Sequence, residues 1–65
     1  MEEKMIFVNF TGCLYTKTFE DVREIRYYIK YNKLLIVYED MSCKLISDVE
    51  GFMTGTMVKY IVITD

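Results

Sequence analysis

The amino-terminal part of the chain alternates between hydrophobic and polar positions, a pattern typical of a β-hairpin. Residues 5–10 place three hydrophobic side chains on one side of an extended segment, as expected of a half-buried strand. These side chains are Ile6, Val8 and Phe10. Thr11-Gly12 supplies turn residues, and residues 13–19 can form the returning strand. The pattern therefore predicts an antiparallel hairpin at the start of the fold.

The hydrophobic residues of the segment 19–31 fit both the period of a helix and the period of a strand. As a helix, it would begin at a capping box formed by Thr18 and Asp21, and Asn32 would end it in the left-handed conformation. Tyr27 and Tyr31 would then stand on its outer side. As a strand, residues 24–31 alternate, with one face formed by Ile25, Tyr27, Ile29 and Tyr31. The helical alternative predicts an α+β fold, with a helix at 19–31 packed on an antiparallel sheet.

The next strand, residues 34–39, favours the extended alternative because only two residues separate it from the disputed segment. A two-residue turn would place Arg26 opposite Glu39, which is a pair of opposite charge. It would also place Tyr28 opposite Val37, an aromatic side chain against a β-branched one. We therefore predict a strand rather than a helix.

Two more strands are expected towards the carboxyl terminus. A turn at 40–42 leads to a short strand at 43–46, and interruptions at 47–48 and Gly51 precede a last strand at 57–64. This last strand is hydrophobic on both faces, which predicts a central position or a covering second layer. The hydrophobic runs 34–38 and 60–63 should be paired on both sides or buried at a subunit contact, because an open hydrophobic edge aggregates.

The pattern as a whole predicts a mainly β protein. We expect one domain over residues 1–65, without linkers, built as a small antiparallel meander or barrel of about five strands. Composition reinforces this prediction, because Ile, Val, Thr, Tyr and Phe supply 29 of the 65 residues and the helix-favouring Ala and Gln are absent. The hydrophobic share of 52% is high for so small an interior. Hydrophobic side chains are therefore expected outside the core, at a homodimer or higher homo-oligomer contact or at a partner surface.

The chain carries few groups suited to catalysis. It has no His, which is the commonest general base and metal ligand, and two cysteines are too few for a structural zinc site. We expect Cys13 and Cys43 to be free, small and buried. Paired carboxylates at 2–3, 20–21 and 39–40 fall at a terminus or in turns, where solvation explains them. The sequence thus predicts no catalytic residue, no metal, no cofactor and no enzymatic activity.

Charge and terminal sequence set expectations about partners and location. Ten acidic and eight basic residues give a net charge of −2, which disfavours nucleic-acid binding. The alternative, a small β-barrel that binds single-stranded nucleic acid, rests on Arg26, Tyr28 and Lys30, which would share one strand face. A secretory signal and a membrane-spanning run are not evident, so the expected location is cytoplasmic and no membrane association is expected.

Binding to another protein is the function that the sequence favours, because Tyr, Met and Arg are enriched at interfaces. The predicted hairpin would carry a hydrophobic strip on its second face, formed by Tyr28, Leu35 and Val37. Its charged rim would consist of Arg26, Lys30 and Glu39, and Tyr31 is a further candidate contact. A small non-enzymatic module of this kind can be an inhibitor, such as the antagonists that phages and mobile elements direct at host proteins. A structural subunit of a larger assembly is the other alternative.

Overall fold

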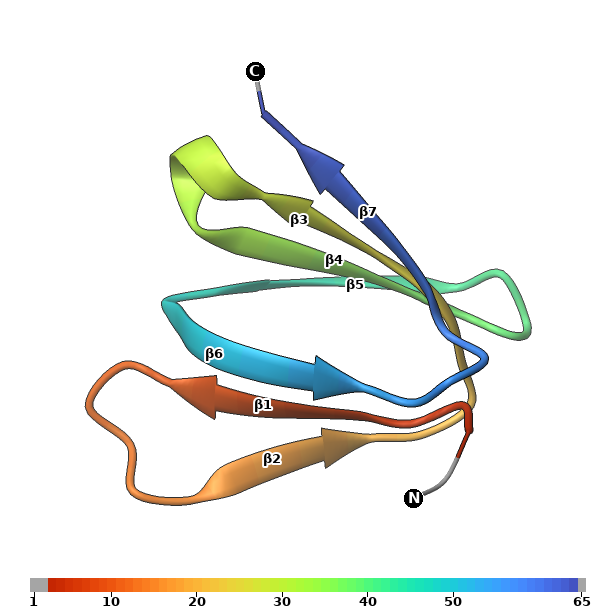
Figure 1. Ribbon diagram of the computed structural model, residues 1–65, viewed down its shortest axis with the longest axis horizontal. Coiled ribbons are helices and arrows are strands. Elements are labelled where there is room, and N and C mark those ends of the chain that lie inside the picture. Colours follow the sequence, from red (N-terminus) through yellow and green to blue (C-terminus); the bar gives the residue numbers. More distant parts are fainter. Residues whose placement is uncertain (1–2, 65) are drawn as a thin grey trace.

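The computed structural model describes residues 3–64 of the chain. In this part of the chain, seven short β-strands form two sheets that pack face to face (Figure 1). The three-stranded sheet contains, in spatial order, β2 (Thr16–Phe19), β1 (Ile6–Phe10) and β6 (Val49–Thr54). The four-stranded sheet contains β5 (Cys43–Ser47), β4 (Lys33–Tyr38), β3 (Val22–Tyr28) and β7 (Lys59–Ile63). All pairs are antiparallel except β3 with β7, so the fold is mainly β, as the sequence predicted.

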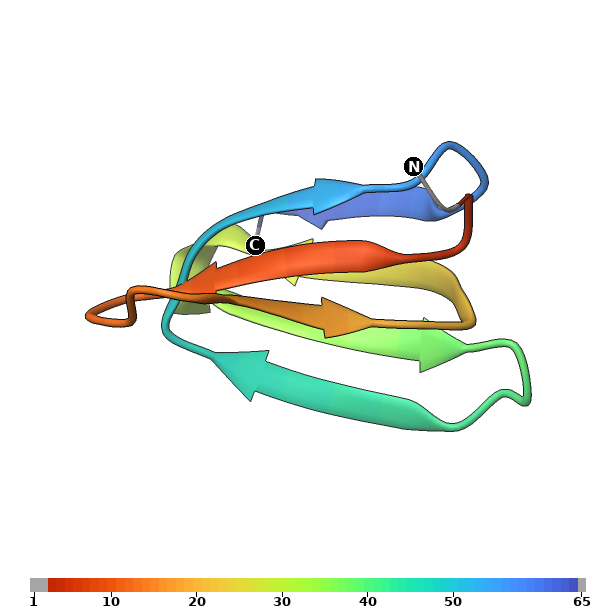
Figure 2. The same cartoon turned by 90° about the horizontal axis from the view of Figure 1, so that it is seen from below.

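The core lies between the two sheets, which Figure 2 shows one in front of the other. Six aliphatic side chains in it have no exposed surface: Ile6, Val8, Val22, Ile25, Leu34 and Ile36. They come from both layers at alternate strand positions, as the pleat of a strand requires. Within residues 3–64 no polar or charged residue is buried, so the two layers are held together by hydrophobic contacts.

Two aspartates in the left-handed conformation turn the chain from one sheet into the other. Asp21 joins β2 to β3 and Asp48 joins β5 to β6, each with a φ of 57°. Aspartate tolerates this conformation better than most residues. Hydrogen bonds fix both corners: the Val22 amide donates to the Lys4 carbonyl over 2.8 Å, and the Thr11 amide donates to the Asp48 carbonyl over 2.9 Å.

The disputed segment is a strand, but its predicted register is wrong. The strand ends at Tyr28, and Ile29–Tyr31 forms one turn of 3-10 helix that Asn32 closes with a φ of 52°. The Tyr27 hydroxyl donates to the Asn32 side-chain oxygen over 3.1 Å and holds this turn against the sheet. Because the turn lies at residues 29–32 instead of 32–33, each of residues 24–28 has a partner four positions away from the predicted one; Arg26, for example, is opposite Leu35 and not Glu39. An even displacement keeps the side chains of the two strands on their predicted faces.

The remaining strand predictions are met in part. The first hairpin, the turn at 40–42 and the short strand β5 are present, although β2 begins only at Thr16. Strand β6 was not predicted, because Gly51 was interpreted as a break. Gly51 lies inside β6, next to a bulge at Glu50. The last strand, β7, is at an edge of its sheet, so the predicted central position is wrong. The predicted second layer is present on one face only, because Tyr60 and Val62 share the inward rows of Ile25 and Tyr27.

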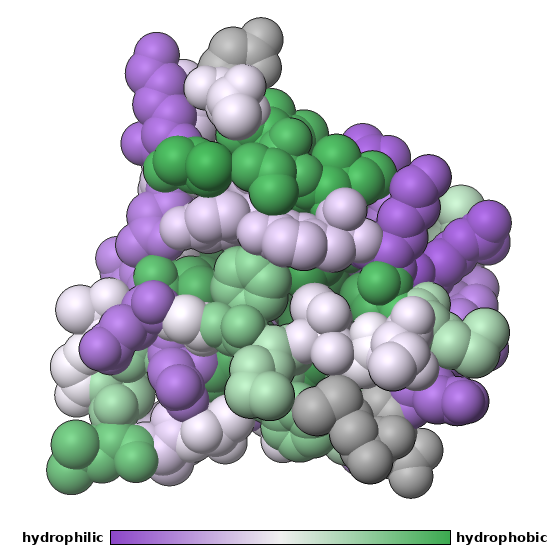
Figure 3. Space-filling view, viewed as in Figure 1, coloured by the Kyte–Doolittle hydropathy of each residue, from purple (hydrophilic) through white to green (hydrophobic). Residues whose placement is uncertain are grey.

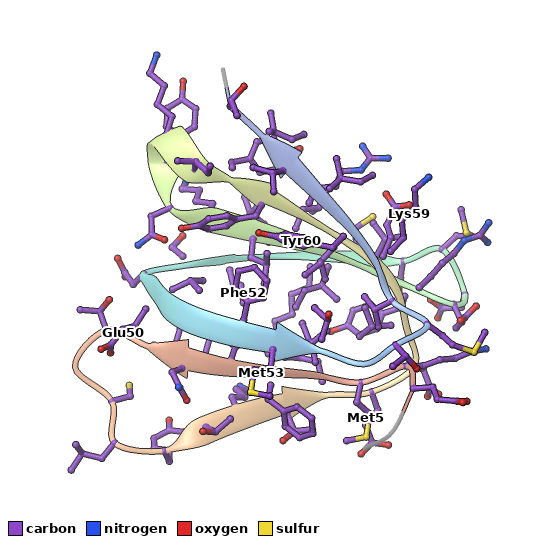
Figure 4. The ribbon with its side chains drawn as sticks, viewed as in Figure 1. Met5, Glu50, Phe52, Met53, Lys59 and Tyr60 are labelled. Carbon is purple, nitrogen blue, oxygen red and sulfur yellow. The ribbon has the colours of Figure 1, made fainter. Side chains whose placement is uncertain are left out.

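The two open sides of the sandwich are closed by different side chains. Between β2 and β5, Phe19 is flanked by the ammonium groups of Lys17 and Lys44, at 5.8 and 5.9 Å from the ring centroid. Between β6 and β7, Phe52 lies edge-on to Tyr27 and to Tyr60, both at 5.4 Å between centroids. Figure 4 shows Phe52 and Tyr60 pointing towards each other across this side. One side therefore carries cations, whereas the other is aromatic.

The turn between β4 and β5 makes stability depend on pH. The Asp40 carboxylate accepts hydrogen bonds from the Ser42 hydroxyl, over 2.6 Å, and from the Ser42 amide, over 3.0 Å. These bonds lower the pKa of Asp40 in the folded protein. Since the unfolded chain then binds the proton more tightly, the stabilisation is present above about pH 4 and is lost as the pH falls through the folded pKa.

We expect Ser42→Ala to flatten the decline of unfolding free energy between about pH 5 and pH 2, because it removes the hydroxyl that contributes most to this shift. Urea unfolding at a series of pH values measures the effect. Ser47→Ala, which alters an exposed serine at the end of β5, is the matched control. Identical pH profiles for Ser42→Ala and the wild type would contradict the assignment.

Candidate protein-binding face

The outer face of the four-stranded sheet carries a hydrophobic strip across all four strands. The pairing registers align Leu45 with Leu35, and Leu35 with Arg26. Arg26 is in turn aligned with Ile61. Leu45, Leu35, Arg26 and Ile61 thus form one row across the sheet. The next outward-facing rows add hydrophobic residues from β3, β4 and β7. The outer strip consists of Tyr28, Leu35, Val37, Leu45, Ile61 and Ile63.

Burial shows that this face is distinct from the core. Val37 is only 9% exposed, yet it does not belong to the core cluster, whereas its neighbour Ile36 does. The alternation of side chains along β4 accounts for this difference, because Val37 points to the opposite side of the sheet. Leu45, at the edge of the outer strip, is 54% exposed. Within residues 3–64 no strand or helix forms a layer over this face.

An ion pair lies within the outer strip. The Arg26 guanidinium contacts the Glu24 carboxylate at 2.7 Å, two positions away on the same face of β3. The hydrogen bond to Glu24, reinforced by its negative charge, raises the pKa of Arg26. The guanidinium is largely exposed, whereas Glu24 is more deeply set. Beside this pair the surface forms a shallow hollow lined by Arg23, Glu24, Arg26, Leu35, Val37, Met41 and Cys43.

No family model, curated protein or solved structure matches this chain. The interpretation of the outer strip therefore rests on its own geometry and chemistry. Hydrophobic side chains surround the ion pair of Arg26 with Glu24 on this face, and the face carries tyrosine and arginine, two residue types that are enriched at protein contact surfaces.

The structure brings together only part of the predicted site. Tyr28, Leu35, Val37 and Arg26 share the outer face, as predicted. The expected pairing of Arg26 with Glu39 is wrong, because the register places Leu35 opposite Arg26. Arg26 forms its ion pair with Glu24 of the same strand. Glu39 instead contacts Lys4 at 3.1 Å.

The two remaining predicted contacts, Lys30 and Tyr31, lie in the 3-10 turn and not on a strand. The Lys30 ammonium is 5.9 Å from the Tyr31 ring centroid, so these two side chains contact each other beyond the end of β3. Their displacement has the same cause as the register error, since the turn takes up residues that were assigned to the strand.

Sequence reasoning missed half of the outer strip, namely Leu45, Ile61 and Ile63. The hydrophobic positions of β7 were noticed, but their alignment with β3 depends on a parallel pairing between segments more than thirty residues apart. A parallel pair leaves no short-turn signal in the sequence. Leu45 could have been found from the alternation of residues 43–47, had β5 been aligned with β4.

The described residues offer little other chemistry. Cys13 and Cys43 are free, as expected, but both are exposed and not buried. The acidic residues at 20–21 and 39–40 are exposed, as expected of turns, while Glu2 lies outside the described residues. Residues 3–64 contain no group of His, Cys, Asp and Glu side chains arranged to hold a metal ion. No helix in this part of the chain has the length and hydrophobicity needed to cross a membrane.

Proposed function

We propose that this protein is a non-enzymatic binding module that attaches to another protein through the outer strip. The observation that carries the proposal is the strip itself, a hydrophobic surface on four strands that no second layer formed by residues 3–64 covers. Tyr28 and Arg26 add the two residue types that most often dominate binding energy at interfaces. Inhibition is the mode of action that fits such a module, because occupying a partner's surface requires no chemistry.

Charge favours a protein over a nucleic acid as the partner. Arg26, the basic residue at the centre of the outer strip, is already paired with Glu24. Lys33 and Lys59 also lie on this face, opposite Tyr28 and Glu24, so its cations are spread among hydrophobic and acidic residues and do not form the cluster that phosphate recognition uses. The cytoplasm, where a small protein with free exposed cysteines remains reduced, is the location that we propose.

We expect Tyr28→Lys to lower the affinity for the partner at least about tenfold, because it puts a charge into the hydrophobic part of the contact. The immobilised wild-type chain and the variant are compared for the proteins that they retain from a lysate of the source cells. Wild type should retain one protein in stoichiometric amount, and Tyr28→Lys should retain much less of it.

The matched control is Thr18→Lys, which places the same side chain on the outer face of the other sheet, where Thr18 is exposed and paired with Phe7. It should retain the partner as wild type does. Circular dichroism confirms that both variants are folded. The proposal is refuted if wild type retains no stoichiometric protein, or if Tyr28→Lys and Thr18→Lys behave alike.

A further inference from the structure

Strand β7 presents a free edge that is hydrophobic on both of its faces. It pairs with β3 on one side only, and its sequence after Lys59 is Tyr60, Ile61, Val62 and Ile63. Tyr60 and Val62 face inward, yet they are 48% and 43% exposed. Figure 3 shows hydrophobic residues as a band along the course of this strand. Unpaired backbone groups flanked by such side chains are a template for another β-strand.

The other three edge strands carry the features that prevent such pairing. Lys17 lies in the middle of β2 and Lys44 lies within β5, and charged residues are the usual protection of an edge. β6 contains the bulge at Glu50, which interrupts a regular ladder. In residues 3–64, β7 is the one edge strand with neither an internal charge nor a bulge. Its open edge is therefore the one suited to pairing.

We propose that β7 pairs with β7 of a second copy of this chain, in antiparallel orientation, to form a dimer with a continuous eight-stranded sheet. Only a register centred on Ile61 pairs all five residues of both strands. It places the half-exposed Tyr60 opposite Val62 of the second copy, and aromatic and β-branched side chains form favourable cross-strand pairs. The strand is thus complementary to itself, as a twofold contact requires.

Charge supports this orientation. Lys59 is the one charged residue of β7, and the register centred on Ile61 places it opposite Ile63 of the other copy. The two lysines are then four residues apart along the ladder, about 14 Å at the rise of a strand. This separation exceeds the screening length of about 8 Å at physiological salt. Parallel pairing would instead set the two lysines side by side.

The face that carries this edge is large enough for a stable contact. Figure 1 looks onto it down the shortest axis of the molecule, and the Cα positions extend 29 by 27 Å across it. This cross-section is the upper limit of the area that a second copy can cover, and it is of the order of the roughly 800 Å² per partner that stable interfaces bury. The free edge of β6 lies on the same face, so the three-stranded sheets of the two copies would also approach each other (Figure 2).

The test is the mass of the protein in solution at micromolar concentrations, measured by sedimentation equilibrium. Wild type should have twice the 7.8 kDa of the chain. In a twofold dimer Val62→Lys occurs twice, once in each copy of β7. If each substitution weakens the contact about tenfold, the dimer dissociation constant should rise about 100-fold. Leu45→Lys, which puts the same charge on the far edge of the sheet, should remain dimeric. Circular dichroism verifies the fold of both variants.

A cross-linking measurement tests the register without relying on a charged variant. In a chain with Cys13→Ser and Cys43→Ser, the substitution Ile61→Cys places two thiols opposite each other on the twofold axis, within reach of a disulfide. Oxidation should link this variant into a covalent dimer, and should link the control Leu45→Cys far less. Equal linking of both would refute the register.

Ile61 and Ile63 belong both to the outer strip and to β7, but self-pairing uses the backbone edge of β7 and its inward-facing side chains, so the outcomes still separate this proposal from the proposed function. A monomeric wild type would overturn self-pairing and leave the β7 edge to a strand of another protein. A dimer that Leu45→Lys breaks and Val62→Lys preserves would also overturn it, in favour of contact between outer faces. Partner binding is judged separately by Tyr28→Lys, since Val62 points away from the outer strip.

Discussion

Replacement of Leu34 by alanine is expected to remove most of the stability of this protein. Leu34 belongs to the core between the two sheets and has no exposed surface. Truncation of such a leucine costs about 2–5 kcal/mol, through lost burial and the cavity that remains. The total free energy of unfolding of a 65-residue domain is about 3–10 kcal/mol, at about 0.05–0.15 kcal/mol per residue. Urea unfolding followed by circular dichroism should show a midpoint near zero urea or a large shift towards it.

Leu45→Ala is the matched control, because it makes the same change on the neighbouring strand at a residue that is 54% exposed. The unfolding free energy of this variant should be within about 0.5 kcal/mol of the wild-type value. Both variants are measured at one protein concentration, so that any dimerisation contributes equally. Similar losses at the two positions would contradict the assignment of Leu34 to the core and Leu45 to the outer face.

Phe52→Ala is expected to cause the second large loss, about 3 kcal/mol. Phe52 closes the side of the sandwich between β6 and β7, where its ring meets Tyr27 and Tyr60 edge-on. Removing it leaves both tyrosines without their shared neighbour and opens the core on that side. Chemical unfolding measures the loss, and near-ultraviolet circular dichroism reports the altered packing of the tyrosines.

Phe52→Leu separates the aromatic contribution from the loss of volume. Leucine retains much of the hydrophobic side chain but makes no edge-to-face contact, and each such contact contributes about 0.5–1.5 kcal/mol. The expected loss is about 1 kcal/mol, between wild type and Phe52→Ala. If leucine were as destabilising as alanine, ring geometry would be the main contribution; if neither variant lost stability, the aromatic cluster would not join the two sheets.

Local pattern was sufficient for every described strand except β6, and for the faces of most of them. The alternation in β1 separates Ile6 and Val8 from the residues between them, and the same period sets Ile25 and Ile36 inward. Tyr28, Leu35 and Val37 were placed together on the outer face although their register was wrong, because an even displacement does not exchange the faces of a strand. Half of the candidate surface was therefore predictable from residues close together in the chain.

The sequence by itself thus determined a β protein, the residues that point to the same side of each strand, and a composition without the usual catalytic and metal-binding groups. Only the tertiary structure decided the register of β3 with β4, since it depends on which residues form the turn, and these are 29–32. It also decided the corners at Asp21 and Asp48 and the parallel pairing of β7 with β3. These features arise from contacts between distant segments, whose energies depend on how the two layers pack and leave no periodic trace in the chain.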